Sequence, residues 1–163
     1  MDVLDIAPLD WWALLSCFLS ALIIGLERQL MGKPIGMRTS ALICMGTYVF
    51  VAITRHMSNE VTDPSRIVGQ VITGIGFLGA GVMMSKNGSI VGVTSAAAIW
   101  ILAAVGVIIG MGYYVLGVKI AVLTVGILVG VNCLESSFAF LRQGAHVKRE
   151  QRKGRAKKAP SED

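Results

Sequence analysis

Five apolar runs, separated by short polar or glycine-containing segments, occupy most of this chain. They cover Leu9 to Leu26, Thr39 to Ile53, Ile67 to Met84, Val91 to Met111 and Tyr113 to Leu134. A helix needs about 20 mainly apolar residues to cross a hydrocarbon layer of roughly 30 Å, so runs of this length predict transmembrane helices. The sequence therefore predicts an all-α, polytopic membrane protein with about five spans.

The composition leaves little room for a soluble domain. Hydrophobic residues make up 54% of the 163 residues and charged residues only 15%, which is too apolar for an ordinary protein surface. The lipid bilayer is the expected solvent. Eight of the fifteen Lys and Arg residues lie between Arg142 and Lys158. We expect a transmembrane domain over residues 1–140 and a disordered, basic cytoplasmic tail over residues 141–163.

Positive charges in the short loops predict the orientation of the helices. Arg28, Lys33 and Arg38 follow the first run, Lys86 follows the third, and the basic tail follows the fifth. Lys and Arg are enriched in cytoplasmic loops, so these segments are expected in the cytoplasm. With five spans, the N-terminus then lies outside and the C-terminus inside.

Two aromatic pairs predict one membrane interface. Trp11 and Trp12 begin the first run, and Tyr113 and Tyr114 begin the last. Such pairs are typical of the aromatic belts of membrane proteins, and both are expected at the same face. The N-terminus lacks the positively charged leader of a signal peptide, so we expect the first run to be retained as a span.

The sequence contains no recognisable catalytic or metal-binding pattern. Cys17, Cys44 and Cys133 each lie in an apolar run without a CxxC pair or a nearby histidine, so we interpret them as packing residues. His56 and His146 are the only histidines, and no nucleophile and base share a known spacing. We therefore expect neither an enzyme nor a nucleic-acid partner, and Mg²⁺ is the one possible cofactor.

Glycines are concentrated in the third run, although each glycine inside a helix lowers its stability by roughly 1 kcal/mol relative to alanine. They are Gly69, Gly74, Gly76, Gly79 and Gly81. One interpretation is close packing of helices, which small residues permit in lipid. The other is a broken or easily unwound helix whose backbone lines an ion or substrate site. The sequence leaves both open.

Two further glycine pairs predict packing faces in the last two runs. Gly106 and Gly110 are four residues apart, as are Gly126 and Gly130. This spacing is typical of helix packing in membranes, including packing between protomers. We therefore expect a homo-oligomer, with a dimer favoured.

Glu27 and Arg28 lie where the first run meets its loop. Ionisable groups at membrane depth are unfavourable and are usually paired or functional. Glu27 could therefore interact with Arg28 or Arg38 and close this loop. Interfacial anchoring explains the same residues equally well.

Asp63 and Pro64 predict the start of the third helix, with Asp63 as the N-cap and Pro64 in the first helical position. Arg66 and Gln70 lie one turn apart and could form a polar patch with Asp63 on the outer side. No acidic residue occurs between Asp63 and Glu135. Because Mg²⁺ needs hard oxygen ligands, Glu27 and Asp63 are the candidate metal ligands.

Three segments, read in order, resemble the MgtC/SapB family of bacterial membrane proteins. They are GLERQLMGKPIGMRTSAL, DPSRIVGQVITGIGFLGAGVMM and GSIVGVTSAAAIWILAAVGVIIGMGYY, and the resemblance runs from about Trp12 to Val131. By position, the family's motif residues fall on Glu27, Arg28, Gly36, Arg38, Thr39, Asp63, Arg66, Gln70 and Thr94, and on the glycines Gly74, Gly76, Gly79 and Gly81.

The resemblance implies a bacterial inner-membrane protein linked to growth at low magnesium and, in pathogens, to survival inside macrophages. It favours regulation over transport, with inhibition of the F-type ATP synthase as one activity proposed for the family. This sequence departs from the family pattern in two ways. Ser40 stands where many relatives carry histidine, and a basic tail stands where virulence-type members continue into a soluble domain.

Our leading hypothesis is a regulatory membrane module that docks its spans against another membrane complex or a second copy of itself. The alternative is a transporter of magnesium or another ion that uses Glu27, Asp63 and an unwound third span.

Overall fold

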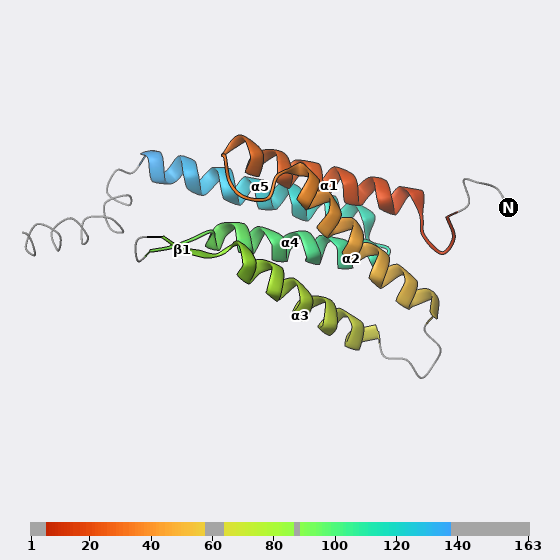
Figure 1. Ribbon diagram of the computed structural model, residues 1–163. Coiled ribbons are helices and arrows are strands. Elements are labelled where there is room, and N and C mark those ends of the chain that lie inside the picture. Colours follow the sequence, from red (N-terminus) through yellow and green to blue (C-terminus); the bar gives the residue numbers. More distant parts are fainter. Residues whose placement is uncertain (1–5, 58–63, 87–88, 138–163) are drawn as a thin grey trace, which may run out of the picture. The chain divides into compact units, whose positions relative to one another are not determined.

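The computed structural model describes residues 6–57, 64–86 and 89–137. Within these ranges the chain forms five helices and one short hairpin (Figure 1). The elements are α1 (Trp11–Leu30), α2 (Met37–Met57), α3 (Pro64–Val82), β1 (Met84–Lys86), β2 (Ser89–Val91), α4 (Val93–Gly110) and α5 (Tyr114–Ser137). The predicted all-α, polytopic fold is confirmed.

Four of the described helices, α1, α2, α4 and α5, are long and apolar enough to cross a membrane. The remaining predicted span, the third apolar run, corresponds to α3, whose apolar part is shorter and covers Val68–Val82. At 1.5 Å per residue this part is roughly 21 Å long, less than the roughly 30 Å of a hydrocarbon core. The first turn of α3, which includes Arg66, therefore belongs to the polar end of the helix.

The chain divides into two units within α5, Met1–Val125 and Gly126–Asp163. The first holds α1 to α4, the hairpin and the first half of α5. The described part of the second unit is the remainder of α5. A Cβ added at Gly126 or Gly130 there would have no described atom within 4 Å. The predicted boundary at residue 140 and the basic tail lie outside the described residues.

Local sequence fixes where α1 begins and ends. The Asp10 side chain accepts a hydrogen bond of 2.9 Å from the Trp12 amide and caps the N-terminus. At the other end, Gly32 has a φ of 61°, and the amides of Gly32 and Lys33 donate to the carbonyls of Gln29 and Arg28. This is a Schellman motif, in which a left-handed glycine ends a helix.

The same device ends α4 and starts α5. Gly112 has a φ of 95°, and the amides of Gly112 and Tyr113 donate to the carbonyls of Ile109 and Ile108. A tight turn therefore joins the fourth and fifth apolar runs. The chain reverses within three residues, because a left-handed glycine can satisfy two helix-terminal carbonyls at once.

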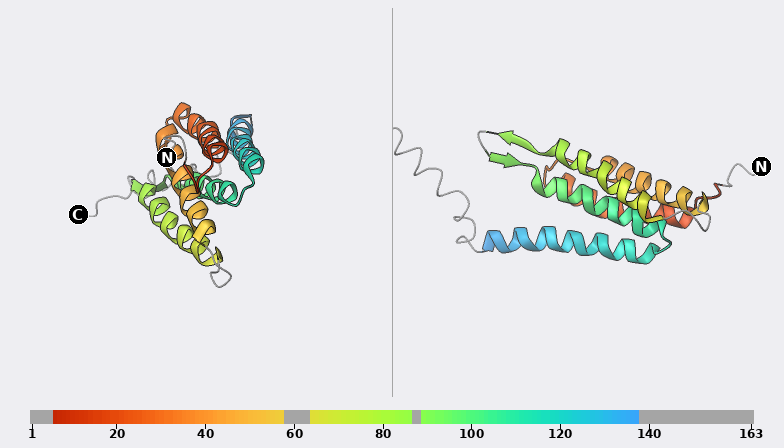
Figure 2. Two further views of the ribbon diagram at one scale, coloured as in Figure 1. Left: turned by 90° about the vertical axis from the view of Figure 1, so that its right-hand side faces the viewer. Right: turned by 90° about the horizontal axis from the view of Figure 1, so that it is seen from below.

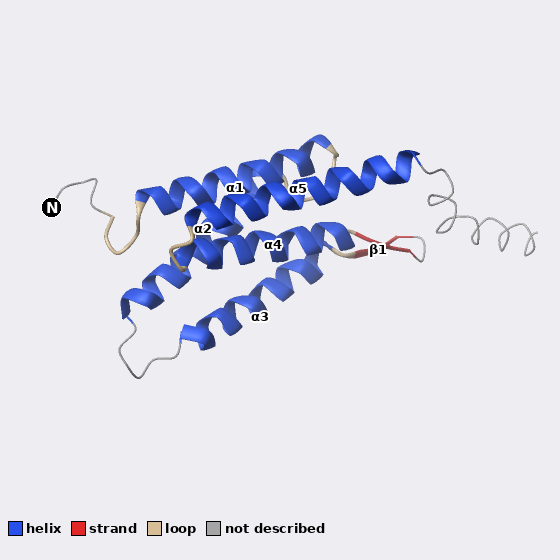
Figure 3. Ribbon diagram, turned by 180° about the vertical axis from the view of Figure 1, so that it is seen from behind, coloured by secondary structure: helices blue, strands red, loops and turns tan. Residues whose placement is uncertain are grey.

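The connection from α3 to α4 contains an antiparallel hairpin. β1 pairs with β2 in the register Met84↔Val91 to Lys86↔Ser89 (Figure 3). Its sequence supports this pairing, since Ile and Val favour strands and Asn-Gly is the dipeptide that most favours a two-residue hairpin turn. The hairpin projects beyond the adjacent ends of α3 and α4 (Figure 2).

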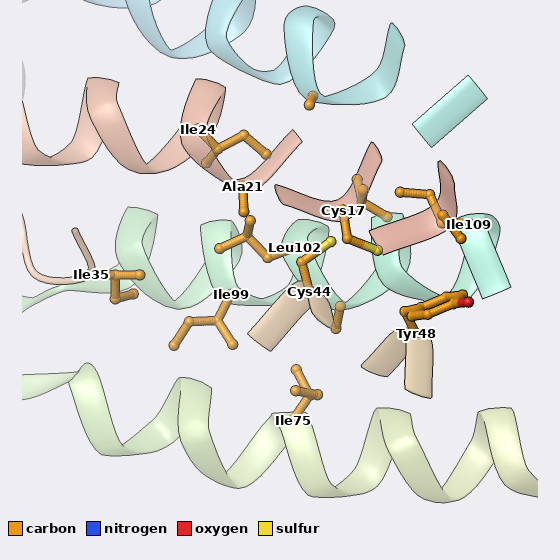
Figure 4. Packing of buried hydrophobic residues seen from close by; sticks show 14 residues of the cluster. Cys17, Ala21, Ile24, Ile35, Cys44, Tyr48, Ile75, Ile99, Leu102 and Ile109 are labelled. Carbon is orange, nitrogen blue, oxygen red and sulfur yellow. The ribbon is translucent and has the colours of Figure 1, made fainter. Parts of the chain in front are cut away.

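The core of the first unit lies where α1, α2 and α4 pack together, with α3 against α4. Figure 4 shows Cys17 of α1 and Cys44 of α2 pointing toward one another, beside Leu102 of α4. Both cysteines are fully buried, as expected of packing residues, whereas Cys133, in the second unit, is exposed.

Glycines bring α4 close to α2. A Cβ added at Gly106 would lie 2.5 Å from the Cys44 carbonyl oxygen, and one at Gly110 would lie 2.7 Å from the Val51 side chain. These distances leave no room for a larger residue. The packing predicted for this pair is observed, but it joins two helices of one chain, so the expectation that it joins protomers was wrong for Gly106 and Gly110.

Candidate functional site

A buried ion pair closes the last turn of α1. Arg28 Nε donates to Glu27 Oε2 at 2.6 Å, and Arg28 Nη2 donates to Glu27 Oε1 at 2.9 Å. Only 6% of Glu27 and 1% of Arg28 are exposed. Of the two partners expected for Glu27, Arg28 is the one observed. The two-point geometry is the strongest form of the arginine–carboxylate interaction.

This pairing is unusual for neighbouring residues, because side chains at i and i+1 do not face each other on a helix. Both side chains must therefore turn toward the same buried space. The position also suits a cation, since Arg28 lies in the last turn of α1, where the helix dipole is negative. Removing one partner of such a buried pair generally destabilises a protein by about 3–5 kcal/mol.

The start of α2 packs closely against α1 near the ion pair in sequence. A Cβ added at Gly25 would lie 2.7 Å from Met37 Cα and 2.9 Å from Ser40 Oγ, so α1 and the start of α2 nearly touch. Ile35, in the intervening loop, has a φ of 76° and is only 9% exposed. A β-branched residue rarely adopts this conformation, and here burial of its side chain in the core holds it there.

Three buried polar atoms of α1 and the start of α2 lack a hydrogen-bond partner among the described residues. They are Arg28 Nη1, Ser20 Oγ and Ser40 Oγ. A buried polar group normally has a partner, and leaving it without one is unfavourable by about 1–3 kcal/mol. The ion pair is therefore neutral as a unit but retains one guanidinium donor for a further acceptor.

The other motif residues of this region lie at the same end of the first unit, which we call the Arg28 end. It holds the α1–α2 loop and the hairpin before α4 (Figure 1). Arg38, Thr39 and Thr94 are exposed there, whereas Gly36 is half-buried and an added Cβ would lie 3.0 Å from Gln29 Oε1.

The remaining motif residues belong to the opposite end, which we call the Asp10 end. It holds the start of α1, α3 and α5 and the ends of α2 and α4. Pro64 begins α3, as predicted, while Asp63 lies outside the described residues. Arg66 and Gln70 are both exposed on α3. Glu27 lies 16 residues along α1 from Trp11, about 24 Å of helix at 1.5 Å per residue, so it is far from this end.

The described residues do not assemble a metal site. No three His, Cys, Asp or Glu side chains gather anywhere in residues 6–57, 64–86 and 89–137. Both carboxylate oxygens of Glu27 already accept hydrogen bonds from Arg28, whose positive charge opposes a cation at the same oxygens. Glu27 is therefore poorly suited to be the Mg²⁺ ligand that the sequence suggested.

The glycines of α3 differ in what surrounds them. Gly79 makes ordinary contact with Trp100 and Ala96 of α4, whereas an added Cβ at any of the other four meets no atom within 4 Å. Those four are Gly69, Gly74, Gly76 and Gly81. Because α3 is a continuous helix through all five, the broken helix is not observed, while an easily unwound helix stays a prediction.

A hydrogen-bonded network at the Asp10 end escaped the sequence analysis. The Asp10 amide donates to the Tyr48 hydroxyl at 2.8 Å, and the Tyr114 hydroxyl donates to Asp10 Oδ2 at 2.6 Å. Arg55 Nη1 donates to the Gly110 carbonyl at 3.0 Å. The aromatic pairs were the only sequence signal, and they were correctly placed at one end. The partners lie up to 104 positions apart, so no local pattern connects them.

Helices long enough to span a bilayer and a charged pair buried among them define a polytopic helical membrane protein. The sequence matches the MgtC family over residues 14–137. That range covers more than half of the chain, so the protein belongs to the MgtC family. The match includes α4 and the whole of α2 and α3, and therefore both groups of motif residues.

Named relatives show the same relationship. The chain is 46% identical over 112 residues to the "Putative magnesium transporter YhiD" of Escherichia coli K12, covering 64% of this chain and 52% of the relative. It is 41% identical over 101 residues to protein MgtC of Salmonella typhimurium LT2, covering 62% and 43%. An uncharacterized protein of Haemophilus influenzae is 46% identical over 100 residues, covering 56% and 42%.

The chain thus spans about half the length of these relatives. No solved structure matches it.

Proposed function

We propose that this protein is a non-catalytic regulatory module of the bacterial inner membrane, which acts at low magnesium by docking α3 against another membrane protein. In this proposal the Asp10 end faces outward and the Arg28 end faces the cytoplasm. The family resemblance suggests the F-type ATP synthase as the regulated complex. A second copy of the chain is the other partner that the glycines of α3 would suit.

The proposal is carried by the outer face of α3, which we define as Arg66, Gln70, Thr73 and Phe77. Spacings of four, three and four residues place these side chains on one side of the helix. All four are exposed, and Phe77 is 81% exposed. Polar groups such as the Gln70 amide are unfavourable when they face lipid without a partner. This face therefore suits a protein surface better than a bilayer.

The open glycines of α3 support the same conclusion. Each lowers helix stability by roughly 1 kcal/mol relative to alanine, and nothing in the described part of the chain uses the space that the missing side chains leave. Small residues allow a second helix to approach closely in lipid. A groove of about 460 Å³ between α2 and α3, lined by Phe50, Gln70 and Gly74 among others, adds a place for a partner's side chains.

A matched pair of glycine substitutions tests this proposal. Gly76→Leu fills the space beside the outer face of α3, while Gly46→Leu fills an equally open position on α2. A Cβ added at either position meets no described atom within 4 Å, so we expect both variants to fold. After mild detergent extraction, wild type and Gly46→Leu should retain a bound protein that Gly76→Leu loses. Equal retention by both variants would refute docking through α3.

The alternative function is transport of Mg²⁺, which is favoured by the name of the YhiD relative. Its test is Mg²⁺ flux into liposomes that contain wild type, Glu27→Ala or Asp63→Ala, compared with protein-free vesicles. Flux that is lost in a variant whose circular dichroism still shows a folded chain would support transport and locate a ligand. A regulator should give no flux above the protein-free vesicles, even when its circular dichroism shows a folded chain.

A further inference from the structure

A polar pocket of about 290 Å³ opens at the Asp10 end, between the ends of α2 and α4 and the starts of α1 and α5. Asp10, Tyr48, Arg55, His56 and Tyr114 supply its polar side chains, and Pro8, Ala52, Ile109 and Gly110 complete its lining. Its size is at the small end of the roughly 300–1,000 Å³ of small-molecule sites. The proposed function gives this pocket no role.

The only carboxylate among these lining residues is already used by the fold. Asp10 Oδ1 accepts from the Trp12 amide, and Oδ2 accepts from the Tyr114 hydroxyl. No ion pair links Asp10 to Arg55 in the part of the chain that is described. Both oxygens of this carboxylate thus accept hydrogen bonds within the fold, one that caps α1 and one from α5.

The donors in the pocket are, by contrast, largely free. Arg55 uses Nη1 to bind the Gly110 carbonyl, which leaves Nε and Nη2 without a partner among the described residues. Tyr48 accepts from the Asp10 amide and still carries its own hydroxyl proton. Figure 4 shows the Tyr48 hydroxyl at the edge of the core, directed away from Cys44. His56 adds a further donor, which is cationic when protonated.

From these contacts we infer that the pocket binds a phosphate-type oxyanion, held by the Arg55 guanidinium with help from Tyr48 and His56. Arginine matches phosphate oxygens with parallel N–H donors, and such charge-assisted bonds are about twice as strong as neutral ones. A cation is disfavoured because Arg55 lines the pocket and each carboxylate oxygen of Asp10 already accepts a hydrogen bond. This inference is independent of docking through α3.

The position of the pocket allows two sources for the oxyanion. Trp11, Trp12 and Tyr113 are all more than half exposed at the same end, as expected of an aromatic belt at headgroup level. The phosphate could therefore be that of a lipid headgroup or an inorganic phosphate ion. Both present the same tetrahedral oxygens to Arg55.

Two probes separate these sources, using the full chain in neutral detergent micelles. Inorganic phosphate is titrated by calorimetry in a phosphate-free buffer at constant ionic strength. Native mass spectrometry then compares retention of phosphatidylglycerol with retention of diacylglycerol, which has the same acyl chains but no phosphate. Binding of inorganic phosphate indicates a free anion, and selective retention of phosphatidylglycerol indicates a headgroup. In both cases the inference also requires that Arg55 contributes to the binding, and the variants below test this.

Arg55→Gln is the decisive variant, and Lys33→Gln removes one positive charge from an exposed position in the α1–α2 loop. Arg55→Gln should weaken the observed binding by about tenfold or more, since it removes a charge-assisted interaction. Tyr48→Phe and His56→Gln should weaken it to a smaller degree, and they decide the question if Arg55→Gln does not fold. Lys33→Gln should bind like wild type.

The inference is overturned if neither probe binds to the folded wild type. It is also overturned if the pocket variants bind as wild type does, or if Lys33→Gln weakens binding as much as Arg55→Gln. In the last case, net charge rather than the pocket would attract the anion.

Discussion

Replacing Glu27 by glutamine should destabilise this protein far more than most single substitutions do. The change keeps the size of the side chain but removes the charge that neutralises Arg28, which is only 1% exposed. Breaking a buried pair by removing one partner lowers the free energy of unfolding by about 3–5 kcal/mol, and burial on both sides means that solvent screening reduces this little. The third guanidinium nitrogen, Nη1, already lacks a partner among the described residues.

A double-mutant cycle measures the interaction itself. Glu27→Gln, Arg28→Gln and the double variant are unfolded in lipid–detergent bicelles, with Arg38→Gln as an exposed-charge control that should change stability by less than about 0.5 kcal/mol. The double variant should be less destabilised than the sum of the single variants, by about 2–3 kcal/mol. If Glu27→Gln unfolds within about 1 kcal/mol of wild type, the ion pair is not the buried element described above.

Two further predictions concern packing and the network at the Asp10 end. Gly106→Ala should lower the free energy of unfolding by about 1–3 kcal/mol, because the added methyl group would lie 2.5 Å from a carbonyl oxygen of α2. Gly46→Ala, whose methyl group meets nothing, should be neutral or stabilising by up to about 1 kcal/mol; equal thermal shifts would contradict this account. Tyr114→Phe removes the hydrogen bond to Asp10 and should destabilise by about 1–2 kcal/mol. Tyr113→Phe, at an exposed tyrosine, should leave the melting temperature unchanged, and equal effects of the two would argue against the network.

Features that depend on local sequence were predicted well. Runs of apolar residues identified the helices, Pro64 marked the start of α3, and Gly112 marked the reversal between α4 and α5. Each of these signals acts within a few residues, because capping, proline geometry and left-handed glycine are properties of the local backbone.

Features that depend on tertiary contacts were not predictable. The sequence left open whether Glu27 pairs with Arg28 or with Arg38, since the choice depends on how the loop after α1 folds. The pocket at the Asp10 end joins residues of α2, α4 and α5 with residues of the segment before α1, and its hydrogen bonds link positions far apart in the chain.

The glycines show the same limit of sequence analysis most clearly. Gly106 and Gly76 look alike in the sequence, since both lie among apolar residues of a predicted span. Gly106 packs tightly against α2, whereas Gly76 faces open space. Only the arrangement of the neighbouring helices distinguishes internal packing from a free surface.

Site-specific photocrosslinking from position 77 tests directly whether α3 docks against another protein. A photoreactive residue replaces Phe77 on the outer face of α3, and a matched one replaces Leu42 on α2, which is 73% exposed. After irradiation of intact bacterial membranes, the position 77 probe should give a discrete protein adduct that the position 42 probe does not give. Mass spectrometry of that adduct would identify the regulated complex or a second copy. Crosslinks only to lipid from both positions would contradict docking through α3, because α3 would then face the bilayer and not a partner.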